Sequence, residues 1–300
     1  MQSLSRYAIQ SLAVAALVLA LKLLAWWITG SVALLSDALE SIINVVVAGA
    51  LWIALTVSAQ PPDSNHPFGH YKAEYFSAGL EGALIIVAAV AIFYKATVHF
   101  FAPAELDAPA LGIGVNIAAS VINVVWGTHL VRVGRRERSP AIEADGRHVL
   151  SDVWSSVGVV LGVGAAVYTG WMQLDALIAA CVGCYILVSG WNLVKSSVGG
   201  LMDEAADPDT LARIEATIAD NATGAIEAHD IQTRPAGPVT FIQFHLVVPA
   251  GMTVSEAHDI CDRIEHALWQ SVPGARVTIH VEPEHKAKRT GIIMSGSAAA

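Results

Sequence analysis

The sequence predicts an all-α bundle of six transmembrane helices followed by a small α+β cytoplasmic domain of ferredoxin-like type, with the order αββαβ. Of the 300 residues, 54% are hydrophobic and only 14% are charged, whereas soluble domains carry roughly 25% charged residues. The apolar residues form long runs up to about Gly200. Beyond that point the pattern changes to short amphipathic and alternating segments, which are typical of a separate soluble domain.

Six apolar runs are long enough to cross a hydrocarbon core, which takes about 20 mostly apolar residues. We expect them at Tyr7–Thr29, Val32–Ala59, Ala73–Phe101, Ala108–Val131, Ala141–Thr169 and Leu174–Gly199. The second, third and fifth runs contain ionisable residues, which should face the bundle interior because a charge facing lipid is costly. The expected domains are therefore 1–203 for the membrane part, 204–285 for the cytoplasmic domain and 286–300 for the tail.

Basic residues set the expected topology. The connection between the fourth and fifth runs contains Arg132, Arg135, Arg136, Arg138 and Arg147, whereas the connections on the opposite side are poor in Lys and Arg. The positive-inside rule then places both termini in the cytoplasm. The three cysteines do not suggest a disulfide framework, which agrees with a reducing compartment. A net charge of −9 argues against nucleic acid as a partner.

The C-terminal domain is expected to contain two helices and three strands. The helices are Pro208–Ala219, with Asp207 as N-cap, and Thr253–Gln270; the strands are Ala228–Thr233, Val239–Val248 and Arg276–Val281. We expect a turn over Arg234–Pro238 between the first two strands. The Gly-, Ser- and Ala-rich residues from Lys286 to Ala300 are expected to be disordered.

Two polar pairs within the apolar runs predict a metal site. His148 and Asp152 are four residues apart, so they lie on one helix face about 6 Å apart along the axis. Glu40 and Asn44 in the second run have the same spacing. Two such pairs on facing helices would supply four N and O ligands, which suits a tetrahedral divalent transition metal. A structural polar network between the helices is the alternative.

Further candidate ligands lie outside the apolar runs. Asp63, His66 and His70 could converge on a metal within one short connection; a capped, proline-rich turn with exposed histidines is the alternative. In the C-terminal domain, His280 and Glu282 share a strand face, which favours a joint ligand role. The other histidines of this domain, taken singly, are typical of a protein surface.

Two accessory carboxylates lie in the apolar runs. Asp37 comes three residues before Glu40 on the same helix face, and Glu81 lies well inside the third run. Because the amide of Asn44 is a weaker donor than a carboxylate for a divalent ion, we expect Asp37 or Glu81 to restore negative potential or to relay protons. Packing against a polar neighbour is the alternative for Glu81.

From about Leu12 to Pro283 the chain resembles the cation diffusion facilitator family, in particular its bacterial zinc- and iron-exporting branch. The matching stretches are Trp26–Val32, Asn65–Glu74, His148 with Asp152, His229–Arg234 and Gly274–His280. The resemblance implies a homodimer that works by alternating access in the bacterial inner membrane. It implies a transport site at Glu40, Asn44, His148 and Asp152, a loop site at Asp63, His66 and His70, cytoplasmic-domain ligands at His229, His245, His258, His280 and Glu282, and an interface charge pair of Lys72 and Asp203.

One departure from the family pattern bears on the metal. The pair in the second run is usually His or Asp followed by Asp, whereas here Glu40 is followed by Asn44. Imidazole from His148 still favours zinc, iron, cobalt or nickel over magnesium or calcium. Since ligands must lose protons before they bind a metal, protons and metal should compete for this site. We therefore expect a metal/proton antiporter that exports a divalent transition metal, with zinc as the leading candidate and iron, cobalt, nickel, cadmium or manganese as others.

Two other functions are compatible with parts of this pattern. A membrane-bound metal sensor or scaffold would use the same ligands without moving metal across the bilayer, and zinc is also expected as a regulatory ligand of the cytoplasmic domain. An intramembrane metalloenzyme would need a catalytic base and an open water position, and the sequence contains no H-E-x-x-H motif. We expect a secondary transporter and not an enzyme.

Overall fold

A computed structural model of the chain describes residues 2–29, 32–101, 110–171, 173–289 and 291–293. In the first part of the second helix, up to residue 40, only the backbone is described. The chain divides into two compact units, Met1–Val198 and Gly199–Ala300. This division lies five residues before the boundary expected after residue 203.

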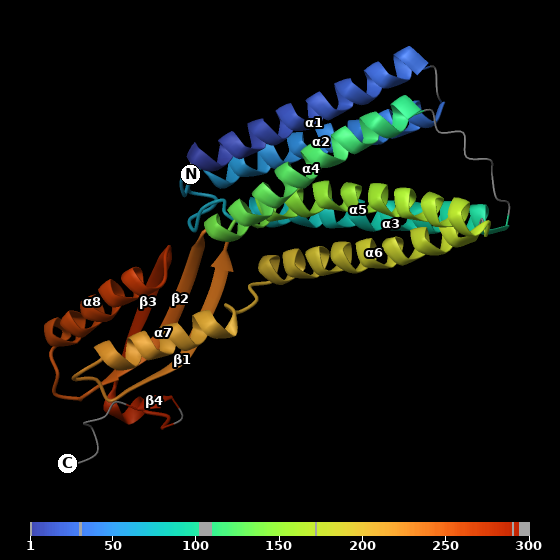
Figure 1. Ribbon diagram of the computed structural model, residues 1–300. Coiled ribbons are helices and arrows are strands. Elements are labelled where there is room, and N and C mark those ends of the chain that lie inside the picture. Colours follow the sequence, from blue (N-terminus) through green and yellow to red (C-terminus); the bar gives the residue numbers. More distant parts are fainter. Residues whose placement is uncertain (1, 30–31, 102–109, 172, 290, 294–300) are drawn as a thin grey trace. The chain divides into compact units, whose positions relative to one another are not determined.

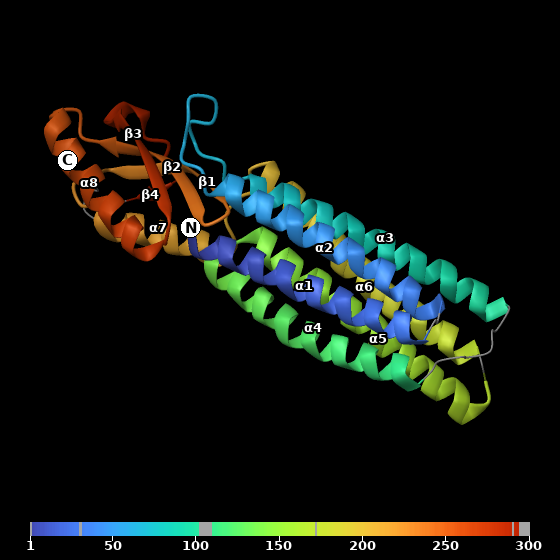
Figure 2. The same cartoon turned by 90° about the horizontal axis from the view of Figure 1, so that it is seen from above.

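The first unit is a bundle of long helices, so the expected fold class is confirmed. The helices are α1 (Gln2–Thr29), α2 (Val32–Ser58), α3 (Ala73–Phe101), α4 (Ala110–Glu137), α5 (Pro140–Thr169) and α6 (Gln173–Leu201). Two perpendicular views show the six helices running side by side (Figures 1 and 2). Helix α5 packs against α2, α3 and α4, which places the polar residues of α5 inside the bundle.

The fourth connection is much shorter than the sequence suggested. Helix α4 continues to Glu137 and α5 begins at Pro140, so the arginines from 132 to 136 and Arg147 are helical. Only Arg138 and Ser139 join the two helices, and Arg138 adopts the left-handed conformation with a φ of 53°. The expected connection was wrong because charged residues also continue a helix beyond the hydrocarbon core, where water solvates them.

The described residues include several apolar segments that are long enough to span a bilayer. Among the described residues, four helices are long and apolar enough to cross a membrane: Leu4–Leu24, Ala73–Phe101, Ile117–Glu137 and Ala176–Leu201. Helix α2 contributes only the shorter apolar segment Asn44–Ser58. The α5 helix has 30 residues, and several ionisable side chains lie in its first half.

Close packing of α4 on α5 depends on glycines. A Cβ atom on Gly134 would lie 2.4 Å from the backbone N of Glu143, and one on Gly146 would lie 2.7 Å from the backbone N of Val131. Small residues that let helix backbones approach are a common basis for helix association in membranes. This contact fixes the half of α5 that carries the candidate ligands.

The second unit is an α+β domain, as expected. It contains α7 (Pro208–Asn221), β1 (Glu227–Ala236), β2 (Val239–Val248), α8 (Val254–Ser271), β3 (Ala275–Pro283), a 3-10 turn (Glu284–Lys286) and β4 (Ile292–Ile293). The strand order is β3-β2-β1-β4. Strands β2 and β3 are parallel, whereas β1 is antiparallel to both β2 and β4.

Two expectations about this domain were wrong. Strand β1 continues to Ala236, so the turn is shorter than the expected Arg234–Pro238. Within the tail that was expected to be disordered, Ile292–Ile293 forms β4, paired with Ala228 and Glu227 of β1; residues 294–300 lie outside the described residues. A strand of two residues is too short to show a hydrophobic periodicity in the sequence. It forms because the neighbouring strand β1 pairs with it.

Successive side chains along each strand point to opposite faces of the sheet. One face packs against α7 and α8, and the other faces away from these helices. Ile242, Phe244 and Leu246 of β2 pack with residues of α7 and α8 in one buried core. The helices start where their caps predict: the Asp207 side chain accepts a hydrogen bond from Thr210 N at 3.0 Å, and Thr253 forms a capping box with its N3 glutamate. Because side chains alternate along a strand, His245 points to the face away from these helices.

Candidate metal sites

The side-chain amide of Asn44 joins α2 to α5. Its Nδ2 donates a hydrogen bond of 2.6 Å to Oδ2 of Asp152, and its Oδ1 lies 3.0 Å from Nε2 of His148. His148 is buried, and its Nδ1 has no hydrogen-bond partner among the described residues. Asn44 thus contacts two of the other three residues expected to bind the same ion, His148 and Asp152.

The fourth expected ligand, Glu40, and the accessory residue Asp37 lie in the helical backbone of α2. Their side chains fall outside the described residues. Asn44 follows Glu40 by one helical turn, so the backbone places both residues on the same helix face. The role of Glu40 and Asp37 stays a prediction.

Two buried carboxyl groups extend the polar interior beyond the expected ligands. Asp145 on α5 accepts a hydrogen bond from Ser11 Oγ, and Ser11 in turn accepts one of 3.2 Å from Nε1 of Trp126. Glu81 is fully buried; Ser77 Oγ donates to its Oε1 at 3.3 Å, and its Oε2 has no partner among the described residues.

Asp145 and Glu81 thus add two buried carboxyl groups to the bundle, one on α5 and one on α3. Asp145 was not among the residues predicted from the sequence. It lies three residues before His148 and so on the same side of α5, and this spacing could have identified it.

The connection between α2 and α3 gathers its three expected ligands. Oδ1 of Asp63 lies 3.2 Å from Nδ1 of His66, and Oδ2 lies 3.3 Å from Nε2 of His70. The two imidazoles are 3.0 Å apart at their nearest ring nitrogens. Hydrogen bonds from the backbone N–H groups of His66 and Asn65 hold the pKa of Asp63 below its usual range. One ligand atom from each residue fits within a space suitable for a metal ion.

Three histidines form a row across the cytoplasmic sheet. His229 of β1 is the direct partner of His245 of β2, and His245 is the direct partner of His280 of β3. Directly opposed residues on neighbouring strands point to the same face. The neighbouring ring centroids are 5.3 Å and 4.9 Å apart. Strand register alone thus aligns three of the expected ligands on the open face.

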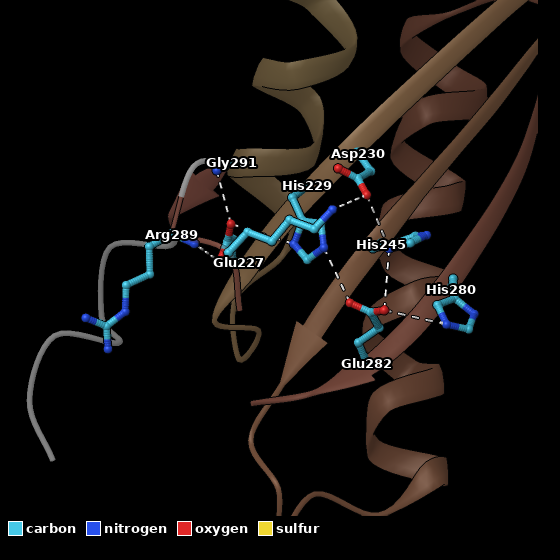
Figure 3. Close-up of polar contacts among 9 residues, drawn as sticks. Glu227, His229, Asp230, His245, His280, Glu282, Arg289 and Gly291 are labelled. Carbon is cyan, nitrogen blue, oxygen red and sulfur yellow. Dashed lines mark hydrogen bonds and ion pairs between the residues drawn. The ribbon is translucent and has the colours of Figure 1, made fainter. Parts of the chain in front are cut away.

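Glu282 completes this cluster (Figure 3). Its carboxylate lies 3.4 Å from Nε2 of His229, 3.5 Å from Nδ1 of His245 and 3.8 Å from Nε2 of His280. Asp230, which was not expected as a ligand, lies 3.8 Å from Nδ1 of His245. Lys288 donates a hydrogen bond to Asp230 and lowers the pKa of this carboxyl group.

The donor set of this cluster fits a divalent transition metal. The His229 side chain is only 2% exposed, yet neither of its ring nitrogens has a hydrogen-bond partner among the described residues. A buried imidazole without partners is costly, and a metal ion is the kind of group that would satisfy it. Imidazole and carboxylate together are typical ligands for zinc and its neighbours.

The structure does not bring His258 to this cluster. His258 lies on α8, where its side chain is 72% exposed and 3.6 Å from Asp262. The expected charge pair also stays a prediction, because Lys72 belongs to the first unit and Asp203 to the second. Within its own unit Asp203 lies 3.6 Å from Nη1 of Arg234.

Comparisons with known proteins cover nearly the whole chain. Residues 8–202 match the family described as the cation efflux transmembrane domain, and residues 206–284 match the cation efflux protein, cytoplasmic domain. An uncharacterized transporter, sll1263, of Synechocystis sp. is 46% identical over 277 residues, which is 92% of this chain and 89% of that protein. The cation-efflux pump FieF of Escherichia coli is 34% identical over 287 residues, covering 96% and 95% of the two chains.

A solved structure described as the zinc form of a candidate zinc transporter, CzrB, is 49% identical. It covers 29% of this chain and 99% of that chain, with a TM-score of 0.28.

Proposed function

The chain belongs to the cation efflux, or cation diffusion facilitator, family, and from this premise we propose that it is a metal/proton antiporter that exports a divalent transition metal, with zinc as its first substrate. The family makes the chain a multi-pass membrane transporter of metal cations. The observation that carries the finer proposal is the contact of Asn44 with both His148 and Asp152 between α2 and α5.

The donor chemistry of this contact supports zinc. His148 offers imidazole nitrogen, Asp152 offers carboxylate oxygen and Asn44 offers amide oxygen, with Glu40 as the proposed fourth ligand. Zinc accepts nitrogen and oxygen ligands in a tetrahedron, whereas magnesium and calcium prefer oxygen alone. The FieF and CzrB relatives also carry names that refer to cation efflux and zinc transport.

Proton coupling follows from the same ligands. Zinc binds when the imidazole is neutral and the carboxylates are ionised, so each bound ion competes with protons for the same lone pairs. On the outer side, protonation of His148 and Asp152 would release zinc. On the cytoplasmic side, loss of these protons would restore affinity. Asn44 supports this cycle, because its amide can satisfy Asp152 and His148 between transported ions.

Zinc flux into proteoliposomes tests the proposal. We expect His148→Ala and Asp152→Ala each to abolish zinc-driven proton movement while the chain still inserts. His99→Ala, which removes a histidine from the last turn of α3, is the matched control and should keep wild-type flux. Retained flux in both site variants would refute the site assignment. Zinc binding without flux in the unaltered chain would favour the alternative, a membrane-bound sensor or scaffold.

We also infer a homodimer in the bacterial inner membrane with both termini in the cytoplasm. The match of residues 206–284 to a cytoplasmic domain of cation efflux proteins supports the dimer and the location of the second unit. Arginines at the end of α4 support the same orientation by the positive-inside rule. Light scattering of the purified chain tests the dimer, and reporter fusions at each terminus test the orientation.

A further inference from the structure

The C-terminal segment (residues 284–289 and 291–293) contacts the cytoplasmic cluster through Glu227. Glu227 begins β1 and is only 1% exposed. Its Oε2 accepts a hydrogen bond of 2.9 Å from the backbone N–H of Arg289, and its Oε1 accepts one of 3.0 Å from that of Gly291. Neither the sequence patterns nor the family resemblance assigns a role to Glu227 or to this segment.

The same carboxylate faces His229. Glu227 Oε1 lies 3.6 Å from Nδ1 of His229, whereas Nε2 of His229 lies 3.4 Å from Glu282. Figure 3 shows the imidazole of His229 between these two carboxylates, with Glu227 also reaching the backbone of Arg289 and Gly291. The separation of 3.6 Å exceeds a hydrogen bond, so the contact in this structure is electrostatic. The two nitrogens of one buried ring thus face two different carboxylates.

Close approach of the segment to β1 requires a glycine. A Cβ atom on Gly291 would lie 2.2 Å from the backbone O of Ala228 and 2.8 Å from Cβ of His229. Ile292 and Ile293 then pair with β1 as β4, and Lys288 pairs with Asp230 on the other side of His229. The segment therefore touches β1 on both sides of this histidine.

We propose that Glu227 is a positioning residue for the cytoplasmic metal site, and that the C-terminal segment holds it in place through Arg289 and Gly291. Glu227 directs the Nδ1–H of His229 toward itself and leaves Nε2 to face Glu282 and a divalent metal ion. Carboxylates that accept the second N–H of a ligating histidine fix its tautomer and raise its basicity. Since a carboxylate buried at 1% exposure needs donors of its own, the backbone N–H groups of Arg289 and Gly291 hold Glu227 in this orientation. This inference rests on the proposed binding of metal at the cytoplasmic cluster.

By linkage, a segment that strengthens metal binding is itself stabilised when the metal binds. The cytoplasmic cluster would then report its occupancy to the C-terminal end of the chain. Removing such an outer carboxylate weakens metal binding on the order of tenfold to a hundredfold. Loss of the segment from β1 should have an effect in the same direction, because Glu227 would lose both of its backbone donors.

Zinc titration of the full-length chain in detergent, with binding measured calorimetrically, tests the proposal. Glu227→Gln removes the charge, and Gly291→Ala displaces the segment without altering any ligand. We expect each to weaken zinc binding at the cytoplasmic cluster about tenfold or more. Gly251→Ala is the matched control, because a Cβ atom at Gly251 meets nothing within 4 Å; it should bind zinc as the unaltered chain does. Equal zinc affinity in Gly291→Ala, Glu227→Gln and the unaltered chain would overturn the proposal.

Two further measurements distinguish the positioning role of Glu227 from the proposed binding of metal at the cytoplasmic cluster. His229→Ala should lower the zinc stoichiometry; an unchanged stoichiometry would show that the cluster binds no zinc, and both ideas would then fail. If His229→Ala loses zinc but Glu227→Gln does not, only the positioning role fails. Hydrogen exchange of the unaltered chain needs no variant: zinc should slow exchange at Arg289, Gly291 and Ile292, and unchanged rates would contradict the coupling.

Discussion

Nδ2 of Asn44 donates a 2.6 Å hydrogen bond to Oδ2 of Asp152, across the interface of α2 and α5. This bond satisfies a carboxylate within the bundle, where an unpaired charge is costly. It also makes the residue that departs from the usual family pattern a direct neighbour of the expected ligands. We therefore expect substitutions at Asn44 to change the affinity of the proposed transport site for metal.

Asn44→Asp should increase the affinity of the transport site for zinc severalfold or more. The substitution exchanges a neutral amide oxygen for a charged one, and the added charge attracts a divalent ion while repelling Asp152 when no ion is bound. Zinc affinity in detergent measures the effect. Asn44→Ala is the paired variant and should lower affinity, because it removes the amide oxygen. Similar affinities in the Asp and Ala variants would show that residue 44 does not contact the ion.

Acidification should weaken zinc binding at the loop of Asp63, His66 and His70 through the imidazoles and not through the carboxylate. The pKa of Asp63 is lowered by backbone hydrogen bonds, so Asp63 stays ionised as the pH falls from 7.5 to 5.5, while imidazoles as a class become protonated. Asp63→Asn should then reduce zinc binding by a similar factor at both pH values. Binding measured at pH 7.5 and 5.5 checks this, and a reduction confined to one pH would contradict it.

Glu81→Gln should make zinc flux less dependent on the proton gradient. Glu81 is fully buried and its Oε2 has no hydrogen-bond partner among the described residues, so we expect it to supply negative potential or to relay protons to the transport site. Flux in proteoliposomes at several internal pH values measures the effect. Glu137→Gln, at the end of α4, is the control and should behave as the unaltered chain. Unchanged flux and pH dependence in Glu81→Gln would assign this residue to packing alone.

Gly134→Ala should destabilise the membrane unit by about 1–3 kcal/mol, the usual cost of overpacking. Its Cβ would lie 2.4 Å from the backbone N of Glu143, so α4 and α5 must move apart. Thermal unfolding in detergent measures the loss as a lower Tm. Gly49→Ala on α2 is the matched control, since its Cβ meets nothing within 4 Å, and it should be neutral or slightly stabilising. Equal Tm values for the two variants would contradict the packing argument.

Spacing within one element could be predicted from the sequence. The i, i+4 separation of His148 and Asp152 indicated a shared helix face, and the structure gives both residues the same contact, Asn44. The alternation around Phe244 predicted β2 with the correct bounds, and Asp207 caps α7 as its position indicated. In each case, the information lies within a few residues of the chain.

Contacts between distant elements could not be predicted in the same way. Glu227 and Gly291 are 64 residues apart, and no periodicity connects them. Asp145 is buried by Ser11, 134 residues away, so its role depends on how α1 packs on α5. His258 was expected as a ligand only because of the family resemblance. In the structure its side chain lies exposed on α8.

His229, His245 and His280 are aligned by the register of β1, β2 and β3. The register of β3 against β2 therefore decides whether His280 lies beside His245. A one-residue shift of β3 against β2 would turn His280 and Glu282 to the covered side of the sheet, although every ligand would still be present in the sequence. A single residue inserted after Val272 could thus erase metal recognition while leaving each coordinating side chain intact. Loop length before β3 therefore determines whether the proposed ligands of this domain face one another.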